Sequence, residues 1–291
     1  MAETIWSGLT LGSIYTLVAL GFMLSLLPSG VINFAQGAIV AFGTYFTYQW
    51  FHSNLSLPLA ILLNLVFGVA LGVFCELVAI RPLRWRRSGS GQSTELVTTV
   101  GVSTALIGLI TVVWGVNALQ VPFRGPTGVV RFLGVVAEPV AIYLVVTVVV
   151  LAVALQVLFR KTRWGQACLA LAEDRPAAAL RGINVNMLSL VAFGVAGALG
   201  TVSGVLIGPI AYATPAGGTT LALGGFVALA MGGNGSFLGC VPGGLLVGLG
   251  SAISTRYLGA SYADLAVLAL LLVTLSIKPR GLGGAAGLRS V

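Results

Sequence analysis

Long apolar runs separated by short polar connections make up most of the chain. The runs interpreted as spanning helices cover residues 5–27, 58–80, 96–115, 140–159 and 188–208, and the shorter run 265–277 completes the set. A helix rises about 1.5 Å per residue, so about 20 apolar residues cross a bilayer core. The pattern predicts an all-α, polytopic bundle of membrane helices.

Two further apolar stretches are interrupted. Residues 37–51 follow a Pro-Ser-Gly break at 28–30, and residues 219–258 are divided by the turn sequence GGNGS at 232–236. Such breaks are typical of discontinuous helices. We expect short helices near 33–51 and 219–240, about eight or nine membrane segments, and a single transmembrane domain over 1–291.

The composition of the chain indicates whether water or lipid surrounds its helices. Hydrophobic residues make up 57%, charged residues 8%, and the mean hydropathy is +1.04. A soluble core cannot hide that much apolar surface, so lipid must surround the helices. The net charge of +8 lies in short connections, which does not predict binding to nucleic acid.

The basic residues predict an orientation. They gather in RPLRWRR, RKTRWGQ and KPRGLGG, and basic loops face the cytoplasm. All 15 lysines and arginines except Arg124, Arg131 and Arg256 then lie on that side. We expect an inner-membrane protein of a bacterial or archaeal cell with its amino terminus outside and its carboxyl terminus in the cytoplasm.

No catalytic or metal-binding set is visible in the sequence. The three cysteines are far apart, His52 is the single histidine, and no GxxxxGK[ST] phosphate loop is present. Glu76, Glu95 and Asp264 are near predicted helix ends, whereas a proton-coupled carrier usually needs an ionisable group at mid-membrane. We expect no enzyme activity and no cofactor in this chain, with transport energy supplied from outside it.

The helix breaks carry uncharged polar groups. Asn33, Gln36 and Gly37 lie at the first break, and Asn234 lies at the second. These amides and the freed backbone carbonyls are candidates to line a solute pathway. The alternative, which the sequence leaves open, is that they satisfy only the broken helix ends.

The longest internal polar stretch, residues 160–186, predicts a cytoplasmic loop with its own helix. Asp174 is a suitable N-cap, Pro176 is tolerated in the first turn, and Gly182 is suited to end the helix. An apolar face of Ala178, Leu180 and Ile183 favours docking into a partner groove. A simple connecting helix is the alternative.

Small-residue stripes predict close helix packing. Glycines recur at intervals of four residues, which lets backbones approach one another in lipid. The stripes are Gly68 and Gly72; Gly200, Gly204 and Gly208; and Gly244 and Gly248. We interpret them first as contacts within this chain.

Six stretches, in order, resemble the membrane-spanning subunits of branched-chain amino-acid ATP-binding-cassette importers, a family that includes urea and short-chain amide permeases. They are GLTLGSIYTLVALG, GVINFAQG, ELVAIRPLR, GQACLALAEDRPAAALRGIN, AMGGNGSFLG and KPRGLGG. The resemblance covers almost the whole chain. It implies a permease subunit of an importer for small amino-acid-like solutes.

The resemblance also implies a transporter of several subunits. Glu173, Asp174, Ala178 and Gly182 correspond to the family's coupling helix, which sits on the ATPase. Expected partners are a second related permease, two cytoplasmic ATPases that bind ATP and Mg, and an external solute-binding protein.

The solute is less closely defined. The family commonly has His and Glu where this chain has Gln36 and Ala38. Branched-chain or hydrophobic amino acids are the first expectation, with urea, short-chain amides and small organic acids as alternatives. An ATP-independent channel for a small neutral solute and a scaffold without transport are rivals that the coupling-like loop disfavours.

The charge distribution leads to a labelling prediction. In a cysteine-free background, single cysteines at Ser90 and Ser290 should react only with reagent on the cytoplasmic side, and one at Ser53 only from outside, because basic loops stay inside. Membrane-impermeant maleimide on oriented vesicles measures this. External labelling at Ser90 would overturn the orientation.

Overall fold

A computed structural model describes residues 1–82, 92–124, 130–132, 135–233, 235–278 and 281. Asn234, and the labelling positions Ser90 and Ser290, lie outside the described residues.

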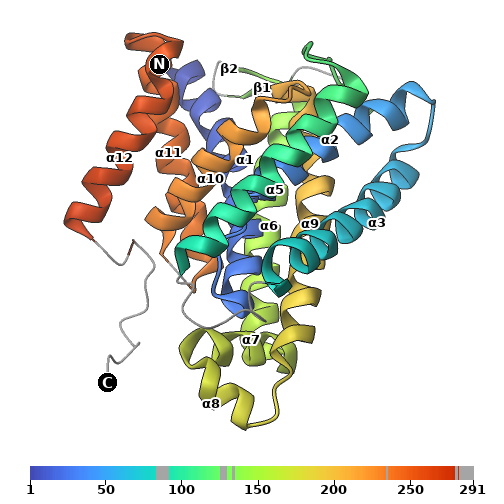
Figure 1. The fold of residues 1–291 in the computed structure, drawn as a ribbon. Helices are drawn as coiled ribbons and strands as arrows, with labels where there is room; N and C mark the ends of the chain where they lie inside the picture. The colour runs from blue at the N-terminus through green and yellow to red at the C-terminus, as the bar shows by residue number, and fades with distance from the viewer. Residues whose placement is uncertain (83–91, 125–129, 133–134, 234, 279–280, 282–291) are drawn as a thin grey trace. The chain divides into compact units, whose positions relative to one another are not determined.

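The described chain is almost entirely helical (Figure 1). A π-helical turn, Glu76–Ile80, continues α3, and a 3₁₀ turn, Ala260–Tyr262, precedes α12. The helices are α1 Ala2–Ser29, α2 Gln36–His52, α3 Leu57–Cys75, α5 Gln92–Trp114, α6 Pro139–Lys161, α7 Arg163–Glu173, α8 Arg175–Leu180, α9 Val185–Ala211, α10 Gly217–Gly232, α11 Phe237–Tyr257 and α12 Ala263–Ile277.

The predicted all-α polytopic class is confirmed. Among the described residues, seven helices are long and apolar enough to cross a membrane. The two interrupted regions contain the shorter helices α2 and α10, as expected from their breaks. A hairpin was not predicted: β1 Val130–Phe132 pairs antiparallel with β2 Val135–Ala137 between α5 and α6.

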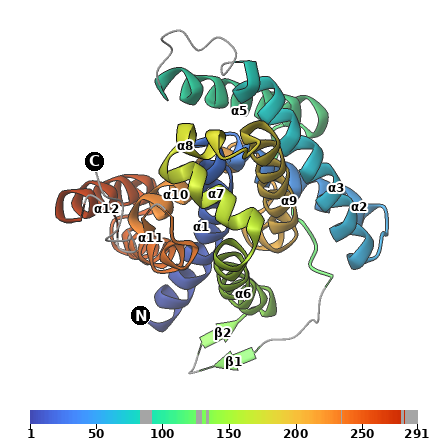
Figure 2. The same ribbon diagram turned by 90° about the horizontal axis from the view of Figure 1, so that it is seen from below.

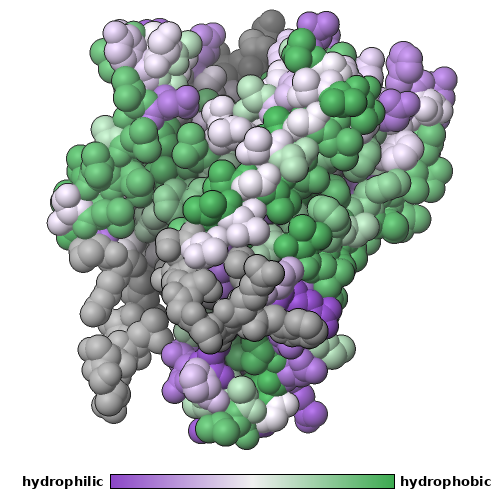
Figure 3. Space-filling view, viewed as in Figure 1, coloured by the Kyte–Doolittle hydropathy of each residue, from purple (hydrophilic) through white to green (hydrophobic). Residues whose placement is uncertain are grey.

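Exposed apolar side chains show which surfaces need lipid or a partner. Val112 on α5 is 84% exposed and Leu272 on α12 is 67% exposed. Figure 3 shows hydrophobic side chains over the visible faces of α3, α5 and α12. Water would make such surfaces aggregate, whereas hydrocarbon solvates them.

The chain divides into two compact units that interleave along the sequence. Unit 2, which contains the predicted first break and the predicted coupling loop, comprises Gly21–Arg124 and Phe159–Ala222. Unit 1 comprises Met1–Leu20, Gly125–Leu158 and Leu223–Val291.

In unit 2, α9 packs against both α2 and α3 through glycine. A side chain at Gly72 would overlap the Phe193 carbonyl, and one at Gly204 would overlap the backbone of Gly43. A buried hydroxyl strengthens the contact, because Thr201 donates to the Asn64 carbonyl at 2.6 Å. The predicted stripes on α3 and α9 therefore pack within this chain.

Unit 1 uses the same device between α1 and α11. A side chain at Gly244 or Gly248 would overlap α1 at Thr16 or Gly12. Close backbone approach increases van der Waals contact, which is a main source of helix association in lipid. The third predicted stripe is thus also an internal contact.

Two arginines outside the predicted basic loops donate hydrogen bonds to groups that lie close to them in the fold. In unit 2, Arg124 donates to the carbonyls of Phe51 at 2.8 Å and Leu55 at 3.0 Å, and to the side chain of Asn54 at 2.9 Å. It therefore closes the carboxyl end of α2, where carbonyls lack helical donors. In unit 1, Arg256 donates to the Thr4 hydroxyl at 2.9 Å.

The glycine contacts predict a contrast in stability. Gly204→Ala should lower the free energy of unfolding by about 1–3 kcal/mol, because the new methyl group overpacks the α2–α9 contact. Gly108→Ala on α5 is the matched control, since nothing lies within 4 Å of its added carbon and alanine favours a helix. Thermal unfolding of the purified permease in detergent measures both. Equal melting temperatures would contradict the packing argument.

Candidate functional site

The first break ends α1 abruptly. Pro28 lacks a backbone N–H, and Gly30 has a φ of +70°, a left-handed conformation that suits glycine after a helix. The Ser29 hydroxyl accepts a hydrogen bond from the Val31 N–H at 3.0 Å. Some backbone groups just after α1 are therefore hydrogen-bonded within this turn.

Asn33 shapes the start of α2. Its side-chain oxygen accepts from the Ala35 N–H at 3.2 Å, and its backbone carbonyl accepts from the Gln36 N–H at 2.9 Å. The side chain is 1% exposed. In this conformation, the amide oxygen of Asn33 supports the broken helix end.

Gln36 reaches a different helix. Its Nε2 donates to the Ala196 carbonyl of α9 at 2.9 Å, while its Oε1 is buried without a hydrogen-bond partner among the described residues. A side chain at Gly21 would overlap the Gln36 amide, and one at Gly200 would lie 2.9 Å from its Nε2. Two glycines thus leave the space that holds this amide, and one acceptor remains available.

Gly37 marks a close approach between α2 and the start of α10. A side chain there would overlap the carbonyl of Gly218. Gly218 is at the first turn of α10, whereas Asn234 follows its last turn and lies outside the described residues. The structure therefore places Gly37 against the first turn of α10.

Asn64 is a polar residue that the sequence analysis missed. It is fully buried in α3 and donates to the Thr47 hydroxyl at 3.2 Å and the Ala60 carbonyl at 3.1 Å. Its Oδ1 is the second buried amide oxygen of unit 2 without a hydrogen-bond partner in the described structure. An asparagine within an otherwise apolar spanning run was the available signal.

The loop predicted over 160–186 forms two helices, α7 and α8. Thr162 caps α7 by accepting from the Gly165 N–H at 3.1 Å. Trp164 packs edge-on against the buried Phe159, with ring centroids 5.0 Å apart. Burial raises the pKa of the Cys168 thiol to about 12, so this cysteine stays protonated and unreactive.

The predicted cap and end of α8 are confirmed. The Asp174 side chain accepts from the Ala177 N–H at 3.0 Å, and Gly182 has a φ of +82° just after the helix. Asn184 then caps α9 by accepting from the Met187 N–H at 3.1 Å. Figures 1 and 2 show α7 and α8 side by side at the end of unit 2 where α9 begins.

The predicted apolar face of α8 needs a correction. Ala178 is 3% exposed and faces its own chain, whereas Leu180 is 89% exposed. Successive residues of a six-residue helix point in different directions, so these two residues cannot share one docking surface. Leu180 is followed by the exposed Arg181, and Glu173 and Asp174 are exposed at the start of the helix, so the exposed residues around α8 carry charges of both signs beside one large apolar side chain.

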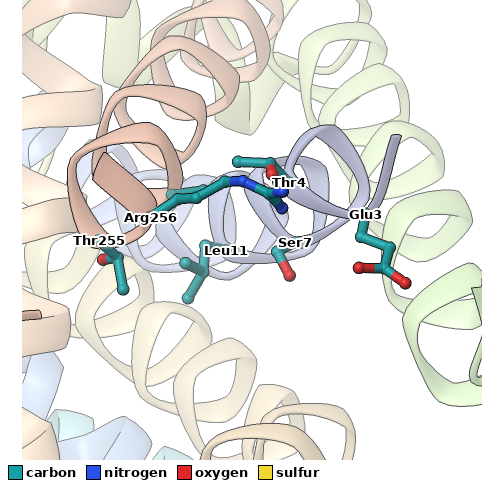
Figure 4. Close-up of a pocket in the computed structure, with 7 residues that line it drawn as sticks. Glu3, Thr4, Ser7, Leu11, Thr255 and Arg256 are labelled. Atoms are coloured by element: carbon teal, nitrogen blue, oxygen red, sulfur yellow. Dashed lines mark hydrogen bonds between the residues drawn. The ribbon is translucent and has the colours of Figure 1, made fainter. Parts of the chain in front are cut away.

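A separate pocket of about 320 Å³ lies within unit 1. In Figure 4, Arg256 extends from α11 to Thr4 of α1, and the Glu3 carboxylate points away from the guanidinium. The lining residues are Glu3, Thr4, Ser7, Leu11, Ala252, Thr255 and Arg256. None of the predicted pathway or coupling residues is among them.

The chemistry of the described residues is that of hydrogen bonding and packing. Over the described ranges, no group of three or more His, Cys, Asp and Glu side chains could hold a metal ion. The buried amides of unit 2 offer neutral donors and acceptors, and the α7–α8 loop offers an exposed, capped helical surface.

Residues 4–275 match the family described as branched-chain amino acid transport system permease components. The high-affinity branched-chain amino acid permease protein LivH of Escherichia coli is 30% identical, with 97% of this chain and 95% of the relative covered. BraD of Pseudomonas aeruginosa is 30% identical with 96% and 94% covered. The ribose import permease RbsC of Haemophilus influenzae is 25% identical with 90% and 80% covered.

A solved structure, PsaBC from Streptococcus pneumoniae in complex with Fab, has a similar fold. Its TM-score is 0.50 at 12% identity, with 94% of this chain and 91% of that chain covered. The fold and the sequence define a polytopic transport permease. This chain belongs to the permease components of branched-chain amino acid transport systems.

Proposed function

We propose that this chain is the translocating subunit of an ATP-driven importer and that α8 is the element on which the ATPase acts. The observation that carries this proposal is the exposed Leu180 on a helix capped at Asp174 and ended at Gly182. A short, capped helix with an exposed leucine suits insertion into a groove of a partner. The family membership supplies the transport context.

The proposed partners are a second permease, two ATPases that bind ATP and Mg, and an external solute-binding protein. The proposed orientation has the α7–α8 loop and the carboxyl terminus in the cytoplasm and the amino terminus outside. Exposed Arg160, Lys161 and Arg163 beside α7 support it, because basic loops stay inside.

We infer that the solute is a small branched-chain or hydrophobic amino acid. The names of LivH and BraD support this class, whereas RbsC is a relative named for ribose. Neutral amides at the α1–α2 break suit a dipolar solute that must bind weakly and leave again. Urea, short-chain amides and small organic acids are the alternatives.

We place Asn33, Gln36, Gly37 and Asn234 in the proposed pathway, with Gln36 as its most testable member. Gln36 is fully buried here, so it would meet solute when the transporter changes conformation. Its unpartnered Oε1 supports this role, because a buried acceptor without a partner costs free energy, and a contact with solute is a reason to retain one.

Leu180→Arg should abolish leucine-stimulated ATP hydrolysis, because a charge would replace the apolar docking residue. The measurement uses the complete importer in proteoliposomes with its binding protein. Leu180→Met is the matched control and should remain active, since it keeps a similar apolar volume.

Ala178→Arg provides a contrast within the same helix. Ala178 is buried, so this change should reduce the amount of folded permease itself, whereas Leu180→Arg should not. Normal coupling in Leu180→Arg would refute the docking surface.

Gln36→Leu should reduce leucine uptake by about tenfold at unchanged expression, through loss of one polar contact to solute. Uptake per folded complex and ATP hydrolysis without solute are measured together. Loss of folded complex with unchanged uptake per complex would instead assign Gln36 a purely structural role.

A further inference from the structure

Arg175 joins the proposed docking helix to the end of α1. It is the first residue of α8 and is half-buried. Its Nη2 donates to the Pro28 carbonyl at 2.7 Å. Its other terminal nitrogen lies near Gly30, where an added side-chain carbon would be 3.8 Å away. Unit 2 contains all of these residues.

The contact has a clear physical basis. The last carbonyls of a helix have no N–H in the next turn and carry partial negative charge, so a cation is favourable there. A hydrogen bond from a charged group is shorter and stronger than a neutral one. Arg175 therefore closes the carboxyl end of α1 from a distant part of the chain.

We propose that Arg175 is a positioning residue that transmits movement of α8 to the α1–α2 break. This inference rests on the proposed docking of the ATPase at α8. A displacement of α8 pulls on the Pro28 carbonyl, and the chain runs from there through Asn33 directly to Gln36. The Gln36 amide is held against the Ala196 carbonyl of α9, so movement of the break changes that contact.

The geometry gives Arg175 and Leu180 different tasks. Leu180 is 89% exposed and faces outward, whereas Arg175 is half-buried and reaches inward to α1. Loss of Leu180 should prevent the partner from docking. Loss of Arg175 should leave docking intact and interrupt transmission.

The test compares Arg175→Gln with Arg163→Gln in the complete reconstituted importer. Arg163 is an exposed arginine at the start of α7 in the same loop. Arg175→Gln should assemble and hydrolyse ATP, but leucine transported per ATP hydrolysed should fall by about tenfold, the scale of one charged hydrogen bond. Arg163→Gln should keep the native ratio, and Arg175→Lys should recover part of it by retaining the charge.

Other outcomes are distinguishable. A native ratio in Arg175→Gln, together with lost stimulation in Leu180→Arg, refutes the transmission role and leaves the docking proposal standing. Native coupling in both variants refutes the docking proposal itself. A lower melting temperature and less assembled complex in Arg175→Gln, with a native transport ratio, shows that Arg175 only stabilises α8.

Discussion

A backbone hydrogen-bonding group inside a membrane protein must find its partner within the protein, and this requirement governs both ends of α2. At the start of α2, Asn33 accepts from the Ala35 N–H. At its end, Arg124 donates to the Phe51 carbonyl. Defined side chains thus close both ends of α2, which makes the first break a fixed feature of the fold.

The fold also depends on the space that glycine residues leave between helices. In unit 2, α9 approaches α2 and α3 so closely that side chains at Gly72 and Gly204 would overlap neighbouring backbone. The lack of a side chain at Gly21 of α1 and at Gly200 of α9 leaves room for the Gln36 amide. A polar group can therefore lie among apolar helices because small residues surround it, and its position depends on their packing.

The α7–α8 loop also has its backbone groups capped by side chains. Thr162, Asp174 and Asn184 cap three successive helices. A loop that is capped at each start moves as a connected element more readily than an unstructured tether. Its link to α1 through Arg175 connects α8 directly to the first break.

The sequence by itself determined the features that depend on local chemistry. Apolar run length predicted the spanning helices, Asp174 and Gly182 predicted the limits of α8, and glycine spacing predicted the packed stripes. These signals lie within a few residues of the structures they specify, so one chain suffices to detect them. The missed hairpin of β1 and β2 had no strong alternating run to indicate it.

The tertiary structure alone decided which way side chains face and which distant groups they meet. Ala178 points inward and Leu180 outward. The sequence could not predict this difference, because a helix of six residues is too short for its apolar pattern to identify a face. Gln36 bonds to Ala196, and Arg175 to Pro28. These partners are separated by more than a hundred residues, and only the packing of whole helices brings them together.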